Sequence, residues 1–175
     1  LNKPKTWLLA HTEDTLDKHQ EDAFLGLVSR LSDGEPLPYL TGSQSFYGLD
    51  FKVSPAVLIP RPETELLVEE ALSWLSKNPE AQTVLDVGTG SGCIAISLLK
   101  NNESIKITAL DISNKALKIA RENAKIHQVS HRLDLVHSNL LSQFKGQTSL
   151  LCANSPYIPS QTLQTLAVTK WEPAL

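Results

Sequence analysis

Residues 83–100 read TVLDVGTGSGCIAISLLK, a short apolar run followed by three spaced glycines and a second apolar run. Residues 83–88 predict a buried strand that enters a glycine-rich turn, and residues 91–100 predict the helix that leaves it. A strand that passes through a tight turn into a helix is the first half of a strand–helix–strand unit. The stretch therefore predicts an α/β fold.

The same alternation continues toward the C-terminus. The sequence predicts further strands at 105–112, 133–138 and 149–153, and a second helix at 114–127. Strands that alternate with helices indicate a mostly parallel sheet with helices on both faces. In such a sheet, ligands bind at the carboxyl ends of the strands, near the point where the strand order reverses.

The residues before this sheet have a different character. Residues 1–40 are polar with apolar side chains at helical spacing, which predicts a small helical domain. Residues 35–55 bring together proline, glycine and aromatic residues, and residues 41–58 predict a β-hairpin linker around Gly48. The main domain would then run from 59 to 175 and begin with a helix that carries Pro62 in its first turn.

The composition is that of a globular protein, since 41% of the 175 residues are hydrophobic and 20% are charged. No apolar run approaches the roughly 20 residues that span a bilayer, and no signal peptide is visible, so we expect no membrane association. The net charge of -3 gives no bulk attraction to nucleic acid. The two cysteines fit a reducing compartment, so we expect a cytoplasmic location. His127, His131 and His137 flank a predicted strand, where we expect exposed polar positions, and we expect no metal site.

Polar and glycine residues gather at the four predicted strand ends. They are Gly88–Gly92, Asp111–Ile112, Ser138–Leu140 and Asn154–Tyr157. Glycines let the backbone approach a ligand closely, and the helix start after them offers free N–H groups to an anion. Asp111 can accept hydrogen bonds from the ribose hydroxyls of a nucleoside cofactor. The alternative for Asp111 is an N-cap of the next helix, a role that Ser113 or Asn114 fills equally well.

The fourth strand runs into ANSPYIP (153–159), which fits either a simple turn or a functional site. We expect this strand beside the first one, so that the turn lies next to the glycine loop. The side-chain oxygen of Asn154 and the backbone carbonyl of Ser155 can accept hydrogen bonds from a planar amide or aryl amine, and Tyr157 can stack on it. Catalysis of this kind works by positioning the nitrogen and needs no strong base.

The stretch NSPYIP (154–159) resembles the Asn-Pro-Pro-Tyr motif of amino methyltransferases. Together with LIPRPETE (58–65) and LDVGTGSGCIAI (85–96), it resembles the HemK/PrmC family of peptide chain release factor glutamine N5-methyltransferases. The resemblance runs from about Trp7 to the end of the chain. It implies a Rossmann-like class I methyltransferase sheet. It also implies methyl transfer from S-adenosylmethionine to the glutamine amide in the Gly-Gly-Gln motif of class 1 release factors.

The resemblance further implies a role for each residue of the site. The residues implied to bind the cofactor are Asp86, Gly88, Thr89, Gly90, Ser91, Gly92, Asp111, Asn139, Leu140 and Asn154. Those implied to bind the substrate are Asn154, Ser155, Pro156, Tyr157, Arg61 and Thr64, and the first four are also the implied catalytic residues. The implied partner is a class 1 release factor, which the N-terminal helical domain helps to dock.

Three features depart from the family pattern. Ser155 replaces the first proline of the motif, but its carbonyl remains and Pro156 still holds it extended. Asn139 replaces an aspartate that commonly meets the adenine amine, and its side-chain oxygen can still accept that bond. The chain has no Met and stops at Leu175, so we expect it to be a fragment that lacks the later strands of the sheet.

Several alternatives stay open at this stage. N6-adenine DNA or RNA methyltransferases also carry an Asn-Pro-Pro-Tyr type of motif, but such an enzyme would need a basic channel that the sequence does not show. A truncated chain that binds the release factor without turnover is the second alternative. A nicotinamide-dependent dehydrogenase is disfavoured because Cys93 stands where the dinucleotide fingerprint needs glycine. We expect a monomer without direct contact to nucleic acid.

Overall fold

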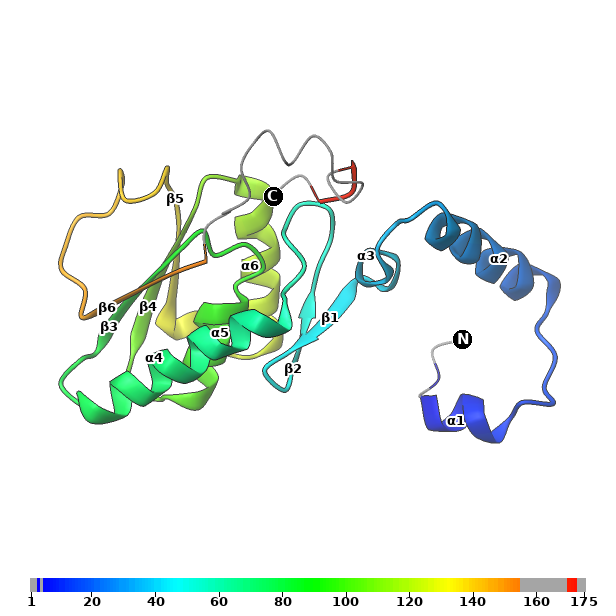
Figure 1. The fold of residues 1–175 in the computed structure, drawn as a ribbon, viewed down its shortest axis with the longest axis horizontal. Helices are drawn as coiled ribbons and strands as arrows, with labels where there is room; N and C mark the ends of the chain where they lie inside the picture. Colours follow the sequence, from blue (N-terminus) through cyan, green and yellow to red (C-terminus); the bar gives the residue numbers. More distant parts are fainter. Residues whose placement is uncertain (1–2, 4, 155–169, 173–175) are drawn as a thin grey trace.

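The computed structural model describes residues 3, 5–154 and 170–172 (Figure 1). A four-stranded parallel sheet forms the centre of its main part. The strands are β3 (Thr83–Val87), β4 (Lys106–Asp111), β5 (Leu133–His137) and β6 (Leu150–Ala153), in the order β5-β4-β3-β6. Each strand agrees with its predicted range to within one residue at either end, and β6 lies beside β3 as expected.

Three helices pack against one face of this sheet. They are α4 (Glu65–Lys77), α5 (Cys93–Asn101) and α6 (Asn114–Ile126), with short 3-10 turns η1 (Pro62–Thr64) and η2 (Ser130–Arg132) before α4 and β5. Residues 93–99 of α5 are all buried, because α5 lies against the sheet and contacts both α4 and α6. Among the described residues, no helix combines the length and the apolar character needed to cross a membrane.

The two faces of the sheet carry different side chains, because successive strand residues point to opposite sides. Val84, Ile107 and Cys152 belong to the large core beneath the helices. Leu85, Val87 and Leu110 form a smaller cluster on the other face, where Val136 and Phe144 pack against them. The α/β class with a parallel sheet is confirmed. Within the described residues the helices cover only one face, since turns and not a helix connect β5 to β6.

The N-terminal elements are α1 (Lys5–Ala10), α2 (Lys18–Ser32), α3 (Leu37–Thr41), β1 (Ser43–Phe46) and β2 (Leu49–Lys52). The predicted hairpin is present, with Tyr47 and Gly48 at its turn with φ of 50° and 72°. A two-residue hairpin turn needs such positive φ values, which suit glycine. Phe46 and Phe51 pack in the large core, so the hairpin is part of the main body. The domain boundaries near residues 40 and 58 stay a prediction.

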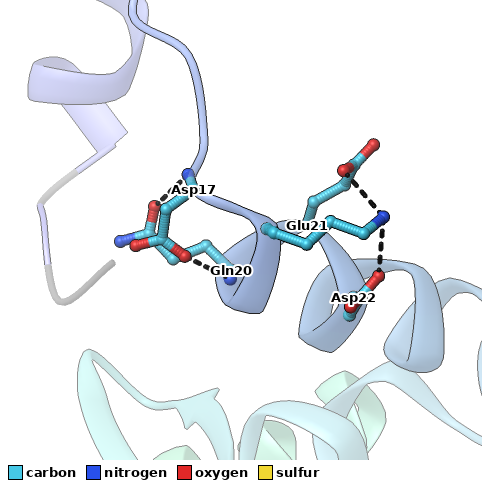
Figure 2. A network of polar contacts seen from close by, with 5 residues as sticks. Asp17, Gln20, Glu21 and Asp22 are labelled. Atoms are coloured by element: carbon cyan, nitrogen blue, oxygen red, sulfur yellow. Dashed lines mark hydrogen bonds and ion pairs between the residues drawn. The ribbon is translucent and has the colours of Figure 1, made fainter.

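Helix α2 begins at a capping box, which Figure 2 shows from close by. The Gln20 N–H donates to the Asp17 carboxylate at 2.8 Å, and the Asp17 N–H donates to the Gln20 side chain at 3.1 Å. Lys18 pairs with Glu21 and Asp22 on the exposed first turn. The capping box fixes where α2 starts and stabilises it by about 1 kcal/mol. The exposed ion pairs add little, because water screens them.

Candidate functional site

A cleft of about 500 Å³ lies at the carboxyl ends of the four parallel strands. This volume is typical of sites for small molecules, which occupy roughly 300–1,000 Å³. The cleft brings together six of the residues that the sequence predicted for the site: Gly88, Gly90, Asp111, Asn139, Leu140 and Asn154. The chain runs from β3 through β4 to β5 and then crosses back to β6 on the other side of β3, and the cleft lies at this switch point in the strand order.

The three glycines of the loop between β3 and α5 have two different structural roles. Gly88, Gly90 and Gly92 all have positive φ, of 74°, 55° and 81°. A Cβ added at Gly88 or Gly90 would meet no described atom within 4 Å, so both present bare backbone to the cleft. A Cβ added at Gly92 would lie 3.0 Å from Ile96 Cδ1 and 3.3 Å from Ala120 Cβ. Gly92 therefore permits close packing of the loop on α5 and α6.

Asp111 ends β4 and connects the glycine loop to the start of α6. One carboxylate oxygen accepts the Gly90 N–H at 2.9 Å, and the other accepts the Ser113 N–H at 2.8 Å. The Ser113 hydroxyl accepts the Ala116 N–H and is the N-cap of α6. Ser113, and not Asp111, is therefore the N-cap of α6. The Asp111 carboxylate lines the cleft and retains lone pairs for further donors.

Asp86 lies behind the glycine loop and is completely buried. Its Oδ2 accepts the Thr89 hydroxyl at 2.6 Å. Burial raises the pKa of Asp86 to about 6, although the Thr89 hydrogen bond lowers it, and the charge of Asp111 adds to the rise. The described residues that line the cleft do not include Asp86, Thr89 or Ser91. The Thr89 hydroxyl connects the loop to Asp86, and the cofactor role of these three residues stays a prediction.

Asn154 follows β6 and lies at the edge of the cleft. Its Nδ2 donates a hydrogen bond to Thr64 Oγ1 at 3.0 Å. Thr64 is the last residue of η1, so the turn that starts with Pro62 brings this hydroxyl to β6. With its nitrogen engaged, the Asn154 amide keeps its oxygen for an incoming donor. The other predicted residues of the motif, Ser155, Pro156 and Tyr157, lie outside the described residues.

Arg61 is not among the described residues that line the cleft, and it pairs with Glu172. One guanidinium nitrogen donates to both carboxylate oxygens of Glu172, at 2.8 and 2.6 Å. Glu172 is only 1% exposed. Burial raises its pKa, and the charge of Arg61 opposes that rise. Arg61 therefore links the start of η1 to residues 170–172, and sequence reasoning missed this contact.

The cleft also has a wall that sequence reasoning missed, formed by residues 55–58 of the linker. Ile112 and Lys115, which follow the end of β4, also line it. Ile112 is 64% exposed, so its apolar side chain is accessible to a ligand. Its position directly after Asp111 places it among the strand-end residues that the sequence predicts near a ligand, whereas Lys115 and residues 55–58 had no such signal.

Comparison with known families identifies two matching regions. The Methyltransferase small domain family matches residues 63–171, and the PrmC N-terminal domain family matches residues 1–42. Of solved structures, the ribosomal protein L11 methylase from Lactobacillus delbrueckii subsp. bulgaricus is 26% identical, with a TM-score of 0.50. That similarity covers 70% of this chain and 60% of that chain.

Curated relatives are more similar in sequence. A release factor glutamine methyltransferase of Koribacter versatilis is 43% identical over 160 residues, which are 90% of this chain and 56% of the relative. One of Moorella thermoacetica is 42% identical over 177 residues, which cover 100% of this chain and 62% of the relative. The chain thus spans about three fifths of the length of these relatives. The chain belongs to the methyltransferase small domain family, and the PrmC N-terminal match together with these relatives confirms the resemblance to the HemK/PrmC family.

Proposed function

We propose that the chain transfers a methyl group from S-adenosylmethionine to a protein glutamine amide. The proposed acceptor is the glutamine of the Gly-Gly-Gln motif in class 1 peptide chain release factors. The observation that carries the proposal is the cleft, where glycine backbone, the Asp111 carboxylate and the Asn154 amide line one edge of the sheet. The relatives are release factor glutamine methyltransferases, which supports the same acceptor.

The residues of the cleft fit S-adenosylmethionine. The space left at Gly88 and Gly90 admits a ligand against the backbone. Asp111 offers carboxylate lone pairs to ribose hydroxyls. Ile112 and Leu140 offer exposed apolar surface to a flat base, and the Asn139 side-chain oxygen offers an acceptor to its amine. When bound, the cofactor supplies an electrophilic methyl group on a sulfonium.

Asn154 is proposed to hold the acceptor amide. An amide nitrogen attacks poorly because its lone pair is delocalised over the carbonyl group. The Asn154 oxygen accepts one N–H of the acceptor, while Thr64 holds the Asn154 nitrogen. From the sequence motif we propose the Ser155 backbone carbonyl as a second hydrogen-bond acceptor and the Tyr157 ring as a surface on which the substrate amide stacks. These contacts orient the nitrogen toward the methyl group, and such positioning is the main source of the proposed rate enhancement.

Asp111→Asn tests the proposed contact with the cofactor. The amide side chain keeps one acceptor for the loop but loses the charge and an acceptor for ribose. We expect the dissociation constant for S-adenosylmethionine to rise about tenfold to a hundredfold, measured by calorimetry, because hydrogen bonds to charged groups are the stronger kind. We expect kcat at saturating cofactor to change little. An unchanged dissociation constant would remove Asp111 from the cofactor site.

Thr64→Val tests how Asn154 is oriented. Valine keeps the shape of threonine but gives the Asn154 nitrogen no acceptor, so the amide loses the bond that fixes it. We expect kcat to fall about threefold to tenfold, the usual value of one such hydrogen bond. Cofactor affinity should stay unchanged. Thr64→Ser keeps the hydroxyl and is expected to restore the rate, and a Ser variant as slow as Val would contradict this role.

A paired methylation assay separates the proposed acceptor from nucleic acid. The full chain is incubated with methyl-labelled S-adenosylmethionine and either a class 1 release factor or adenine-containing DNA and RNA. We expect label in the release factor and none above background in nucleic acid. Label in adenine would replace the proposal by the N6-adenine alternative. Cofactor binding without label in any acceptor would favour the non-catalytic alternative.

The remaining expectations about the molecule belong to this proposal. The proposed location is the cytoplasm, a reducing compartment that suits the two free cysteines. The proposed working form is a monomer that contacts the release factor and not nucleic acid directly. Residues 1–40 are proposed as a domain that helps to dock the release factor, and residues 59–175 as the domain that performs methyl transfer.

A further inference from the structure

Asn123, on α6, makes three hydrogen bonds to the backbone of two distant segments. Its Oδ1 accepts the Lys52 N–H at 2.8 Å, and its Nδ2 donates to the Lys52 carbonyl at 3.0 Å. Nδ2 also donates to the Ser91 carbonyl at 2.8 Å. The residue is 0% exposed. Both N–H donors of this buried amide are therefore engaged with backbone carbonyls.

The two segments that Asn123 holds lead into two walls of the cleft. Ser91 belongs to the glycine loop and directly follows Gly90, which lines the cleft. Lys52 ends β2 and precedes the linker wall at residues 55–58. Figure 1 shows the hairpin beside α6, in agreement with the contact between α6 and β2. One side chain thus fixes the glycine loop and the linker against the same helix.

Two neighbouring residues of α6 also contact these segments, but each of them contacts only one. Ala120, one turn before Asn123, lies against Gly92 of the loop. Glu122, next to Asn123, pairs with the Lys52 ammonium at 2.6 Å on the exposed side. The Glu122 pair joins α6 to the hairpin only. Among these polar contacts, Asn123 is the one that joins the hairpin, α6 and the glycine loop at once.

We propose that Asn123 is a positioning residue for cofactor binding, which sets the spacing between the glycine loop and the linker wall. The inference rests on the proposed function only for the identity of the ligand, S-adenosylmethionine. An apolar side chain at this position would pack but would leave the Ser91 carbonyl without its donor. The loop would then lose its bond to the helix that also holds the opposite wall segment.

The test is calorimetry of S-adenosylmethionine binding to the full chain and to Asn123→Asp. The carboxylate still accepts the Lys52 N–H but presents no donor to the carbonyls of Ser91 and Lys52. We expect cofactor affinity to fall at least about tenfold, as expected when buried acceptors lose their donor. The KM for the release factor should change little, because the hydrogen bonds of Asn123 reach Lys52 and Ser91 and none of the residues proposed to bind the substrate. Glu122→Gln, which removes only the exposed pair, should leave cofactor affinity unchanged.

Asn123→Ser provides a milder variant, since its shorter side chain removes the same bonds without adding charge. Affinity reduced in a variant whose circular dichroism matches the parent supports the proposal. Unchanged affinity in a folded variant overturns it, and so does failure of both variants to fold, which assigns Asn123 a purely structural role. A parent chain that does not bind S-adenosylmethionine contradicts the proposed function instead, so the two failures are distinguishable.

Discussion

Asn154→Ala is expected to lower kcat for methyl transfer by about a hundredfold to a thousandfold, the range seen when a positioned catalytic hydrogen bond is removed. Among the described residues none donates a hydrogen bond to the Asn154 side-chain oxygen, while the side-chain nitrogen donates to Thr64 Oγ1. Alanine removes the acceptor that orients the substrate amide. Release factor methylation under saturating cofactor measures the effect.

Cofactor affinity is the control for this prediction. Asn154 lines the cleft, but Gly88, Gly90 and Asp111 form the larger part of the proposed cofactor contacts. We therefore expect the dissociation constant for S-adenosylmethionine to change by about threefold or less, which corresponds to one weak hydrogen bond. Equal loss of affinity and rate would show that Asn154 acts mainly on the cofactor. Asn154→Asp keeps an acceptor and should retain more activity than the alanine variant.

Gly92→Ala is expected to have the largest effect on stability. At a φ of 81°, a Cβ costs about 1–2 kcal/mol of free energy, because L-residues are strained in the left-handed region. The same Cβ would lie 3.0 Å from Ile96 Cδ1 and 3.3 Å from Ala120 Cβ, and such overpacking costs about 1–3 kcal/mol more. Urea unfolding should therefore show a loss of about 2–5 kcal/mol in the free energy of unfolding.

Gly48→Ala is the matched control. Gly48 has a φ of 72°, and a Cβ there would meet no described atom within 4 Å. This variant has the backbone strain without the overpacking, so it should lose only about 1–2 kcal/mol. Equal losses in the two variants would contradict the close packing of the glycine loop on α5 and α6.

The fold was largely predictable because local patterns agree with the tertiary structure. Short apolar runs bounded by glycine, asparagine or proline located all four strands of the sheet. The exposure of α2 was less predictable. Phe24, Leu27, Val28 and Leu31 have helical spacing, yet they are between 39% and 57% exposed. Spacing predicts that a helix forms, but whether a neighbouring element covers its apolar side depends on the tertiary arrangement.

The candidate site was predictable where residues follow strand ends. Gly90, Asp111 and Asn154 reach one cleft because parallel strands end at one edge of the sheet. The bonds that support them were not predictable. Thr64 and Asn154 are 90 residues apart, and Asn123 lies 71 residues from Lys52. Such bonds depend on tertiary packing, which no local pattern in a single sequence encodes.

Arg61 illustrates the same limit. Its place in LIPRPETE implied a substrate contact, but the structure pairs it with Glu172, 111 residues away. A carboxylate as deeply buried as that of Glu172 needs a charged partner, because an unpaired buried charge is costly. No feature of KWEPAL in the sequence indicated that its glutamate is buried.

The central claim is methyl transfer to one glutamine amide, and mass spectrometry of the acceptor tests it most directly. A class 1 release factor is incubated with the full chain and S-adenosylmethionine, and its Gly-Gly-Gln peptide is fragmented, with Asn154→Ala run in parallel. The account predicts a single added methyl on the glutamine side-chain nitrogen, nearly absent with the variant. An unmodified peptide, in a reaction where the chain demonstrably binds cofactor, would contradict it.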